Sequence, residues 1–462
     1  MKKLLSLFFL CFLFFNFSEA QNNLSETEIN LINLSLEKSY TLKEANYELS
    51  IDSLESKAIR QNFIPTLELD ALYGYGQSDI TVDVPTFQLP ITGIELFEGE
   101  SEYEAKGSVF NTNLTAKALL FSGLQVNYGS KASKEKIKAK NFMLNAERAD
   151  IIKDVVDTFD KIELLNKSKA VIEASEKRLA KEKERVNTAI ENGLAIPYDR
   201  DKITAAELNL ASKKAELYGN LSLLYLKLSM LTNVEVATLE SYQFDLKPWL
   251  LLDDSKTFND RPELKALEAS VTAYDYKLKM NRSAFLPKIQ AFATLSYANL
   301  FNAELDTPYN LIGGESVNLE LNKFEAFPSY FLGVGMHWDL FKGLKNSNET
   351  NKTTIEKSIA EEKKTDAAEK LELYAKKVAV DFEVKNQQLL FKEQEKDVSF
   401  NTLNLAIKSY HEGLISINDR LEAETDYQEA VLNYYVLITQ QRMAALDLLI
   451  STGSLQVESL NH

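Results

Sequence analysis

The sequence predicts an α+β protein of two similar halves, each with the element order helix, strand, strand, helix. The first observation is a repeat: Gly193 and Asp199 return 220 positions later as Gly413 and Asp419, each glycine followed by leucine and each aspartate by arginine. The second is that each half contains two segments in which apolar and polar residues alternate. The third is that each half contains a stretch of more than 60 residues without proline. A constant offset over such a distance indicates an internal duplication.

Residues 1–20 are typical of a secretory signal peptide. Lys2 and Lys3 precede an apolar run from Leu4 to Phe15, and Ala20 is a small residue before the expected cleavage site. The apolar run is shorter than the ~20 residues of a membrane-spanning helix. Cys11 is the only cysteine and lies in this segment, so the mature chain has no disulfide and no thiolate site.

The net charge of −16 argues against nucleic-acid binding, which requires a basic face. It suits a soluble surface or a conduit that favours cations. No later stretch is apolar enough to span a membrane as a helix. An exported chain of this kind that enters a membrane must therefore do so as a closed β-barrel.

In the first half, residues 25–61 are expected to be helical, with a capping box formed by Ser25 and Glu28. Pro65 ends this pattern. A period of two follows, with these residues on one face: Leu67, Leu69, Ala71, Tyr73 and Tyr75. The alternation predicts a half-exposed strand, whose apolar face meets either a protein core or lipid.

Residues 77–107 are rich in acids and contain Pro85 and Pro90, so we expect a solvated loop. A second strand is predicted over 108–121, followed by a helix over 124–192. At 1.5 Å per residue this helix is about 100 Å long, which no compact core accommodates, so it must be a coiled-coil arm. A shorter helix returns over 198–232.

The second half repeats this order. Helices are expected over 262–284, 346–412 and 418–450, and a loop over 299–328. The two strands carry the following apolar faces: Ile289, Ala291, Ala293, Leu295 and Tyr297, then Tyr330, Leu332, Val334, Met336 and Trp338. The predicted divisions are a signal peptide (1–20), a first repeat (21–233), a connector (234–260), a second repeat (261–453) and a C-terminal tail (454–462).

Several short motifs accompany the duplication. They are Phe63-Ile64-Pro65 and Phe285-Leu286-Pro287 before the strands, Leu120-Phe121-Ser122-Gly123 and Leu340-Phe341-Lys342-Gly343 after them, Arg261-Pro262-Glu263-Leu264, and the two tips with Gly and Asp six residues apart. In this order the motifs resemble the TolC family of outer-membrane efflux proteins over essentially the whole mature chain.

The resemblance implies a homotrimer in the outer membrane of a Gram-negative bacterium. Each protomer would give four strands to a twelve-stranded β-barrel in contact with outer-membrane lipid, and its helices to an α-helical coiled-coil tunnel in the periplasm. The implied partners are a periplasmic adaptor (membrane fusion) protein and an inner-membrane pump. The residues agree with this in two respects. Four strands alone leave edges that cannot face lipid, and the helical arms are far too long to pack on themselves as a compact domain.

The resemblance also implies a gate at the second tip. It places gate and selectivity roles on Asp419, Glu422 and Tyr410, and a contact between hairpins on Asp199. Rings of such acids around a threefold axis would attract cations and raise one another's pKa values. The alternative for each acid is a solvated coiled-coil position or a charge at a helix N-terminus.

Three other tip positions complete these assignments. Gly193 and Gly413 are expected to form the tip turns. Ile415 stands where the family has an arginine, so that link is absent or rebuilt in this chain.

No residue pattern indicates catalysis, a metal site or a cofactor. His337, His411 and His462 lack partners at metal-ligand spacing, and no H-E-x-x-H motif is present. His411 precedes the second tip, where a surface role is expected, although it could titrate with a nearby acid. The protein is therefore not expected to be an enzyme.

We predict a passive exit duct of a tripartite efflux pump or a type I secretion system, driven by its inner-membrane partner. The alternative is a structural or adaptor coiled-coil protein of the periplasm without a channel. The alternating strands favour the duct. The sequence does not indicate which substrate is exported.

Overall fold

The computed structural model describes residues 24–83, 100–244, 246–250, 260–310 and 316–455, with short stretches between 85 and 96 and residues 457 and 460. The predicted signal peptide lies outside the described residues, as does most of the C-terminal tail. Within the described part, none of the helices is both long and apolar enough to cross a membrane.

The chain forms two compact units. A helical unit contains residues 1–52, 135–271 and 358–462, and a sheet unit contains residues 53–134 and 272–357. Each sequence repeat therefore contributes segments to both units, because the strand pair of each repeat lies between its helices.

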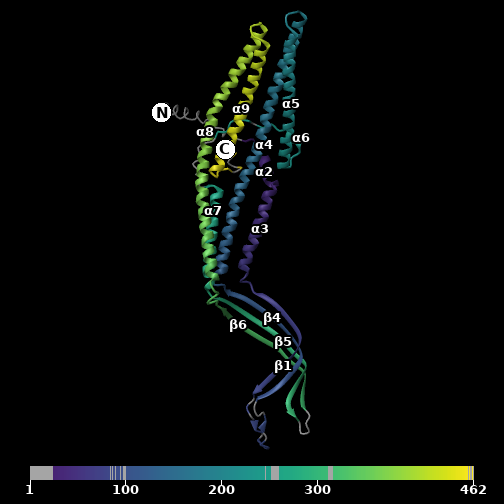
Figure 1. Ribbon diagram of the computed structural model, residues 1–462, viewed down its shortest axis with the longest axis vertical. Coiled ribbons are helices and arrows are strands. Elements are labelled where there is room, and N and C mark those ends of the chain that lie inside the picture. The colour runs from purple at the N-terminus through teal and green to yellow at the C-terminus, as the bar shows by residue number, and fades with distance from the viewer. Residues whose placement is uncertain are drawn as a thin grey trace, which may run out of the picture. The chain divides into compact units, whose positions relative to one another are not determined.

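The helices of the chain are labelled in Figure 1. Their bounds are α2 Glu26–Lys38, α3 Tyr40–Gln61, α4 Gln125–Glu191, α5 Pro197–Thr232, α6 Val236–Glu240, α7 Pro262–Arg282, α8 Lys345–His411 and α9 Ile417–Ser451. The single helix expected over 25–61 is instead two, because the backbone leaves the helical conformation at Ser39. The long helices begin and end within one or two residues of their predicted bounds.

Two helical hairpins make up most of the helical unit. The first hairpin is α4 with α5, and the second is α8 with α9 (Figure 1). Helices α4 and α8 have 67 residues each, which corresponds to about 100 Å.

The main core of the helical unit also contains three residues of the connector: Leu239, Phe244 and Trp249. Trp249 is fully buried, and the Gln441 side chain of α9 binds both its backbone N–H and its carbonyl, at 2.9 and 2.8 Å. The guanidinium of Arg442 lies 4.8 Å from the Trp249 ring centre and pairs with Asp160 of α4 at 2.8 Å. Burial raises the pKa of Asp160 to about 7, although Arg442 acts to lower it.

The sheet unit holds one antiparallel sheet in the order β1-β4-β5-β6. Its strands are β1 Thr66–Asp83, β4 Glu100–Phe121, β5 Lys288–Asn310 and β6 Ser316–His337, and a separate small pair is β2 Phe87–Gln88 with β3 Glu95–Leu96. One face carries the predicted apolar residues, such as Leu67 and Leu69, each 69% exposed. The other face carries polar residues that bond across strands, as Asn113 and Ser296 do at 2.7 Å.

The loops predicted over 77–107 and 299–328 are wrong in length. Strands β1 and β4 are paired from Thr66 with Lys117 to Asp83 with Glu100, and β5 continues to Asn310. Five of the acids that suggested a loop lie on the paired strands β1 and β4: Asp79, Asp83, Glu100, Glu102 and Glu104. Lys106 forms an ion pair with Glu304 at 3.0 Å. Cross-strand pairing of charges stabilises a solvated strand that composition alone suggests is a loop.

Candidate functional site

The tips of both hairpins have the same turn. Gly193 and Gly413 have φ values of +69° and +73°, a conformation that strains residues with a Cβ. After Gly413, the Leu414 N–H bonds the Ser409 carbonyl at 2.9 Å, while the Gly413 N–H bonds the Tyr410 carbonyl at 3.0 Å. These two backbone hydrogen bonds form a Schellman motif, and the first tip has the same pair of bonds.

The return helices begin differently at the two tips. Ser416 caps α9 through a capping box, in which its side chain accepts from the Asp419 N–H and the Asp419 carboxylate accepts from the Ser416 N–H. Ile196 precedes α5 without a side-chain cap, and Pro197 occupies the first turn. The second tip is therefore the one whose turn includes a predicted gate acid.

The predicted gate acids lie on the exposed side of α9. Asp419 and Glu422 are both exposed. Hydrogen bonds from the Ser416 hydroxyl and backbone lower the pKa of Asp419 below its usual value. The capping role expected from the alternative interpretation is thus present in the structure, and it leaves the carboxylate ionised and open to solvent.

Tyr410 of the second hairpin lies within the electrostatic reach of Asp199 of the first. Tyr410 is half-buried, and burial, with contributions from Asp199 and Glu182, raises its pKa to about 12. Nearby, hydrogen bonds from Lys202 and Asn418 lower the pKa of Tyr198, so the first turns of α5 and α9 also touch. The two tips therefore meet through polar side chains within one protomer.

An apolar cluster holds the hairpins together below the tips. Its buried members are Ile172, Leu179, Val186, Ile203, Leu210, Leu217 and Ile417, and Tyr410 and Leu421 pack against it. Most of the buried members belong to the first hairpin.

A buried polar cluster lies beside this apolar one, and the sequence did not reveal it. The Glu424 carboxylate is 3% exposed and accepts from the Ser175 hydroxyl at 2.6 Å and from Arg178 at 2.6 and 3.1 Å. Arg420, one helical turn before Glu424, lies 3.2 Å from it. The four-residue spacing of Arg420 and Glu424 on α9 was a possible signal.

His411 is exposed, as expected, and it also contacts an acid. Its Nε2 lies 3.0 Å from the carboxylate of Glu182, which is largely buried on α4, and Arg185 contacts the ring at 2.7 Å. The second tip is thus linked to α4 at two levels, by His411 and by Glu424.

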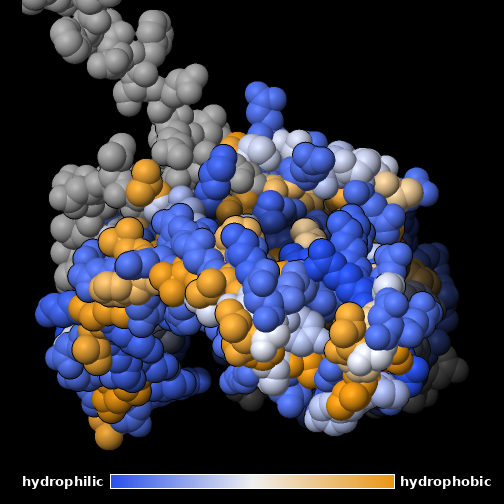
Figure 2. All heavy atoms as spheres, turned by 90° about the horizontal axis from the view of Figure 1, so that it is seen from above, coloured by the Kyte–Doolittle hydropathy of each residue, from blue (hydrophilic) through white to orange (hydrophobic). Residues whose placement is uncertain are grey.

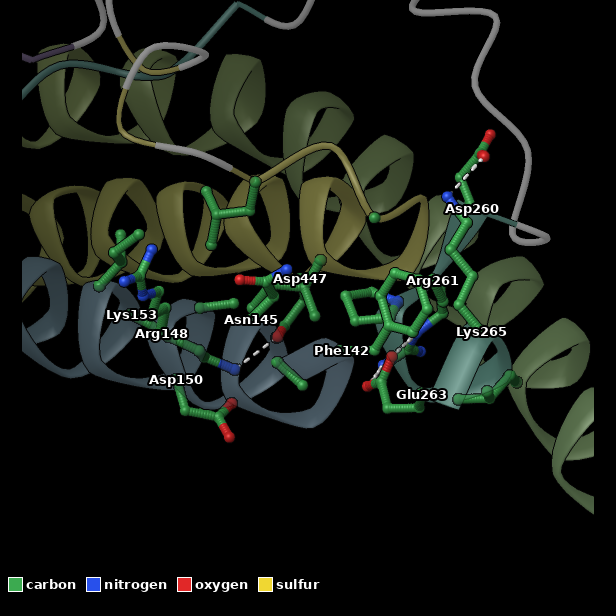
Figure 3. A pocket seen from close by; sticks show the side chains of 18 of the residues that line it. Phe142, Asn145, Arg148, Asp150, Lys153, Asp260, Arg261, Glu263, Lys265 and Asp447 are labelled. Atoms are coloured by element: carbon green, nitrogen blue, oxygen red, sulfur yellow. Dashed lines mark hydrogen bonds and ion pairs between the residues drawn. The ribbon is translucent and has the colours of Figure 1, made fainter. Parts of the chain in front are cut away.

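A pocket of about 800 Å³ lies elsewhere in the helical unit, among α4, α9 and the start of α7 (Figure 3). Its lining includes four basic and four acidic residues. Three ion pairs join members of the lining: Lys153 with Asp447, Arg261 with Glu263, and Lys265 with Asp260. Because its charges balance and largely pair with one another, we place the candidate site at the tips. The described residues contain no group of three His, Cys, Asp or Glu side chains arranged to hold a metal.

The tips also expose apolar side chains. Leu194 and Leu414 follow the tip glycines and are 83% and 75% exposed, and Ile196 is also exposed. Seen from above, hydrophobic residues lie between hydrophilic ones on the surface (Figure 2). Exposed leucines on a turn are typical of a contact surface when they are grouped.

Comparison with known proteins finds a matching family for the second half of the chain and similar folds among solved structures. Residues 255–454 match the family described as outer membrane efflux protein. A search of curated proteins finds no match.

Solved structures resemble the chain over nearly its full length at low sequence identity. The Campylobacter jejuni CmeC outer membrane channel has a TM-score of 0.70 at 15% identity, covering 94% of this chain and 88% of that one. The Vibrio cholerae outer membrane protein VceC has a TM-score of 0.68 at 14% identity, covering 92% and 96%. The open state of the Neisseria gonorrhoeae MtrE outer membrane channel has a TM-score of 0.67 at 16% identity, covering 92% and 88%.

Proposed function

We propose that the chain is a member of the outer membrane efflux protein family and that it is the passive exit duct of a tripartite efflux pump, assembled from three copies. The observation that carries this proposal is the four-stranded sheet with one exposed apolar face and one polar face. An apolar face that meets lipid and a polar face that meets water are what a wall between membrane and lumen needs.

The sheet edges support assembly from several copies. Strands β1 and β6 lie at the ends of the strand order and each has one neighbour in the described sheet. In lipid, unpaired backbone groups on both edges would be costly, and pairing β6 of one copy with β1 of the next removes that cost. Three copies would close a sheet of twelve strands.

The helical unit offers a matching apolar surface. Helix α8 exposes a series of large apolar side chains: Leu373, Val380, Leu390, Phe391, Val398 and Leu405. Such a series on a helix that is otherwise rich in Lys and Glu suits packing against a second copy.

At the second tip, a threefold arrangement would bring three copies of Asp419 and three of Glu422 around one axis. Both are exposed in the protomer, and Asp419 is held ionised by its capping bonds. We assign them to cation selectivity and Tyr410 with Asp199 to holding the closed tip. Gly193 and Gly413 form the turns that present these residues.

The exposed leucines at both tips suit the helical hairpin of a periplasmic adaptor, which would connect the duct to an inner-membrane pump. Because the sequence has no nucleotide-binding motif, energy would come from that pump. A type I secretion system would use the same duct, and protein cargo is the second candidate function.

Single-channel conductance of the detergent-purified protein in a planar bilayer tests the duct and its gate. The variant Asp419→Asn with Glu422→Gln removes both charges and keeps an oxygen that can accept the Ser416 bonds. A matched control, Asp201→Asn with Glu207→Gln, removes two acids from the first hairpin. We expect small cation-selective currents from the native protein and the control, and larger, less selective currents from the gate variant.

Two other results separate the parts of this proposal. Native-like currents from the gate variant would keep the duct and reject the gate assignment. A folded trimer that conducts nothing, or a protein that stays soluble without detergent, would reject the duct in favour of a periplasmic structural protein.

A further inference from the structure

A buried polar cluster joins the two hairpins beside the apolar cluster. We call it the hairpin cluster, and it consists of Ser175, Arg178, Arg420 and Glu424. Ser175 and Arg178 belong to α4 of the first hairpin, and the other two belong to α9 of the second. The Arg420 and Glu424 side chains are 1% and 3% exposed. A carboxylate taken out of water is stable only while a cation and hydrogen-bond donors surround it.

The two arginines do not contribute equally. Arg178 donates to Glu424 from both Nε and Nη2, and its Nη2 also donates to the Ser175 hydroxyl at 2.9 Å. Arg420 approaches Glu424 through Nη2 alone, and its Nε and Nη1 have no hydrogen-bond acceptor among the described residues. A buried guanidinium with two unused donors carries a desolvation cost. Within the hairpin cluster, the ion pair that joins the two hairpins is therefore the one between Arg178 and Glu424.

Arg178 also reaches the third helix of this contact. Its guanidinium lies 5.7 Å from the Tyr427 ring centre, and Tyr427 packs on Phe400 of α8 at 5.4 Å. One α4 side chain thus touches α9 directly and reaches α8 through one aromatic ring. Moving the second hairpin away from α4 would break these contacts together.

The cluster is coupled to the proposed gate by a short stretch of helix. Glu424 lies five residues after Asp419 and two after Glu422 on α9, and it faces α4 while those two acids face solvent. A helix transmits a shift over so short a distance nearly rigidly. A contact that fixes Glu424 against α4 therefore also fixes the positions of Asp419 and Glu422.

We propose that Arg178 and Glu424 are positioning residues of the gate: their buried bond fixes the second hairpin against the first within one protomer, and the tip opens when this bond is broken. This inference rests on the proposed duct. It differs from the gate acids, which would act between copies around the axis.

Five variants test this inference in the planar-bilayer assay. Arg178→Met removes the bond, and Glu424→Gln removes the ion pair and leaves one neutral acceptor oxygen. We expect each to raise the open probability of the channel roughly tenfold, which corresponds to ~1.4 kcal/mol. Arg178→Lys retains a cation but loses the two-point contact of the guanidinium, so we expect an open probability between those of the native protein and Arg178→Met. Arg420→Met removes the incompletely bonded guanidinium and should also stay within about twofold.

The fifth variant, Glu176→Gln, is the matched control. Glu176 lies next to Ser175 but pairs with Lys214 inside the first hairpin, at 2.7 Å. Its loss removes an acid of the same kind without touching the contact between hairpins. We expect a native open probability.

The outcomes separate this inference from the proposed function. Native open probability in folded, trimeric Glu424→Gln would overturn it, as would an Arg420→Met channel that opens as much as Arg178→Met. If both strong variants fail to assemble, Ser175→Ala removes the 2.6 Å bond to Glu424 and the 2.9 Å bond from Arg178, and an unchanged open probability there would overturn it. Absence of current from the native protein would instead reject the duct.

Discussion

The two hairpins have tip turns of the same conformation, but their return helices bury different kinds of side chain. The return helix of the first hairpin, α5, buries Ile203, Leu210 and Leu217 at seven-residue spacing. The return helix of the second hairpin, α9, buries Arg420 and Glu424 near its tip, and further polar groups beyond. Apolar contacts tolerate small shifts because they are not directional, whereas a buried ion pair has one good geometry.

This difference teaches where the molecule can be switched. We call the buried face of each return helix its seam. The apolar seam of α5 makes many contacts of similar energy, so it stabilises the hairpin without fixing one position. The polar seam of α9, which includes Arg420, Glu424 and Arg442, fixes the helix in one position, and the helix can shift when a single ion pair is lost. The second hairpin, which carries the predicted gate acids, is the one with the polar seam. The following predictions break or sharpen the comparison.

The largest effect is expected at Arg442, the deepest cation of the polar seam. Its side chain is 1% exposed and pairs with Asp160, while Glu28 lies 3.9 Å away. Arg442→Met would leave those acids without this cation, so we expect a loss of about 3–5 kcal/mol in the free energy of unfolding. The solvated pair of Lys227 with Asp154 provides a control, since Lys227→Met should cost at most about 1 kcal/mol. Equal effects in urea titrations of the two variants would contradict the comparison.

The apolar seam is tested at Ile203, which is fully buried. Ile203→Ala should cost about 2–5 kcal/mol, and Ile203→Val about 1 kcal/mol, because the loss grows with the cavity. Circular dichroism at 222 nm during urea unfolding measures both. If the loss in the free energy of unfolding does not increase with the side-chain volume removed, the side chains around Ile203 are loosely packed.

A pH dependence is expected from Asp160. Its pKa is raised to about 7, so the folded protein retains a proton that the unfolded chain releases near pH 4. This group therefore adds stability at acid pH that is lost as pH rises from about 4 to about 7. Asp160→Asn should remove that part of the trend in the melting temperature between pH 5 and pH 8. An unchanged difference between native and variant across this range would show that Asp160 stays ionised.

The turns should respond alike, because they are the feature that the hairpins share. Gly193→Ala and Gly413→Ala each place a Cβ at positive φ in open space, so each should cost about 1–2 kcal/mol through backbone strain alone. Gly219→Ala, inside α5 and also in open space, should instead stabilise by about 1 kcal/mol. A cost at only one tip would mean that the two turns differ in a way their backbone does not show.

The smallest effect concerns the caps, where the hairpins differ again. Ser416→Ala removes the capping box of α9 and should cost about 1 kcal/mol. Ile196→Ser would supply α5 with the cap that it lacks and should raise stability by a few tenths to about 1 kcal/mol. The melting temperatures of the two variants should therefore move in opposite directions, and movement in the same direction would contradict the assigned caps.

The sequence predicted the tip turns of the candidate site but not its buried polar cluster. The tip glycines follow from the repeat, and their positive φ is a local property of a helix end. The roles of Asp419, Glu422, Tyr410 and Asp199 stay predictions, although the structure shows the first two exposed and the other two within electrostatic reach of each other. Glu424 was missed because its partner Arg178 is 246 positions away in the sequence.

The sequence by itself determined the duplication, the long helices and the two faces of the strands. These depend on periodicity and on Pro and Gly positions, which act within a few residues. Only the tertiary structure decided which charges are buried, how far the strands extend and where Trp249 docks. A Lys- and Glu-rich helix has the same pattern whether a given acid meets solvent or an arginine on another helix. Burial and pairing are therefore properties of the assembled hairpins, and not of either segment alone.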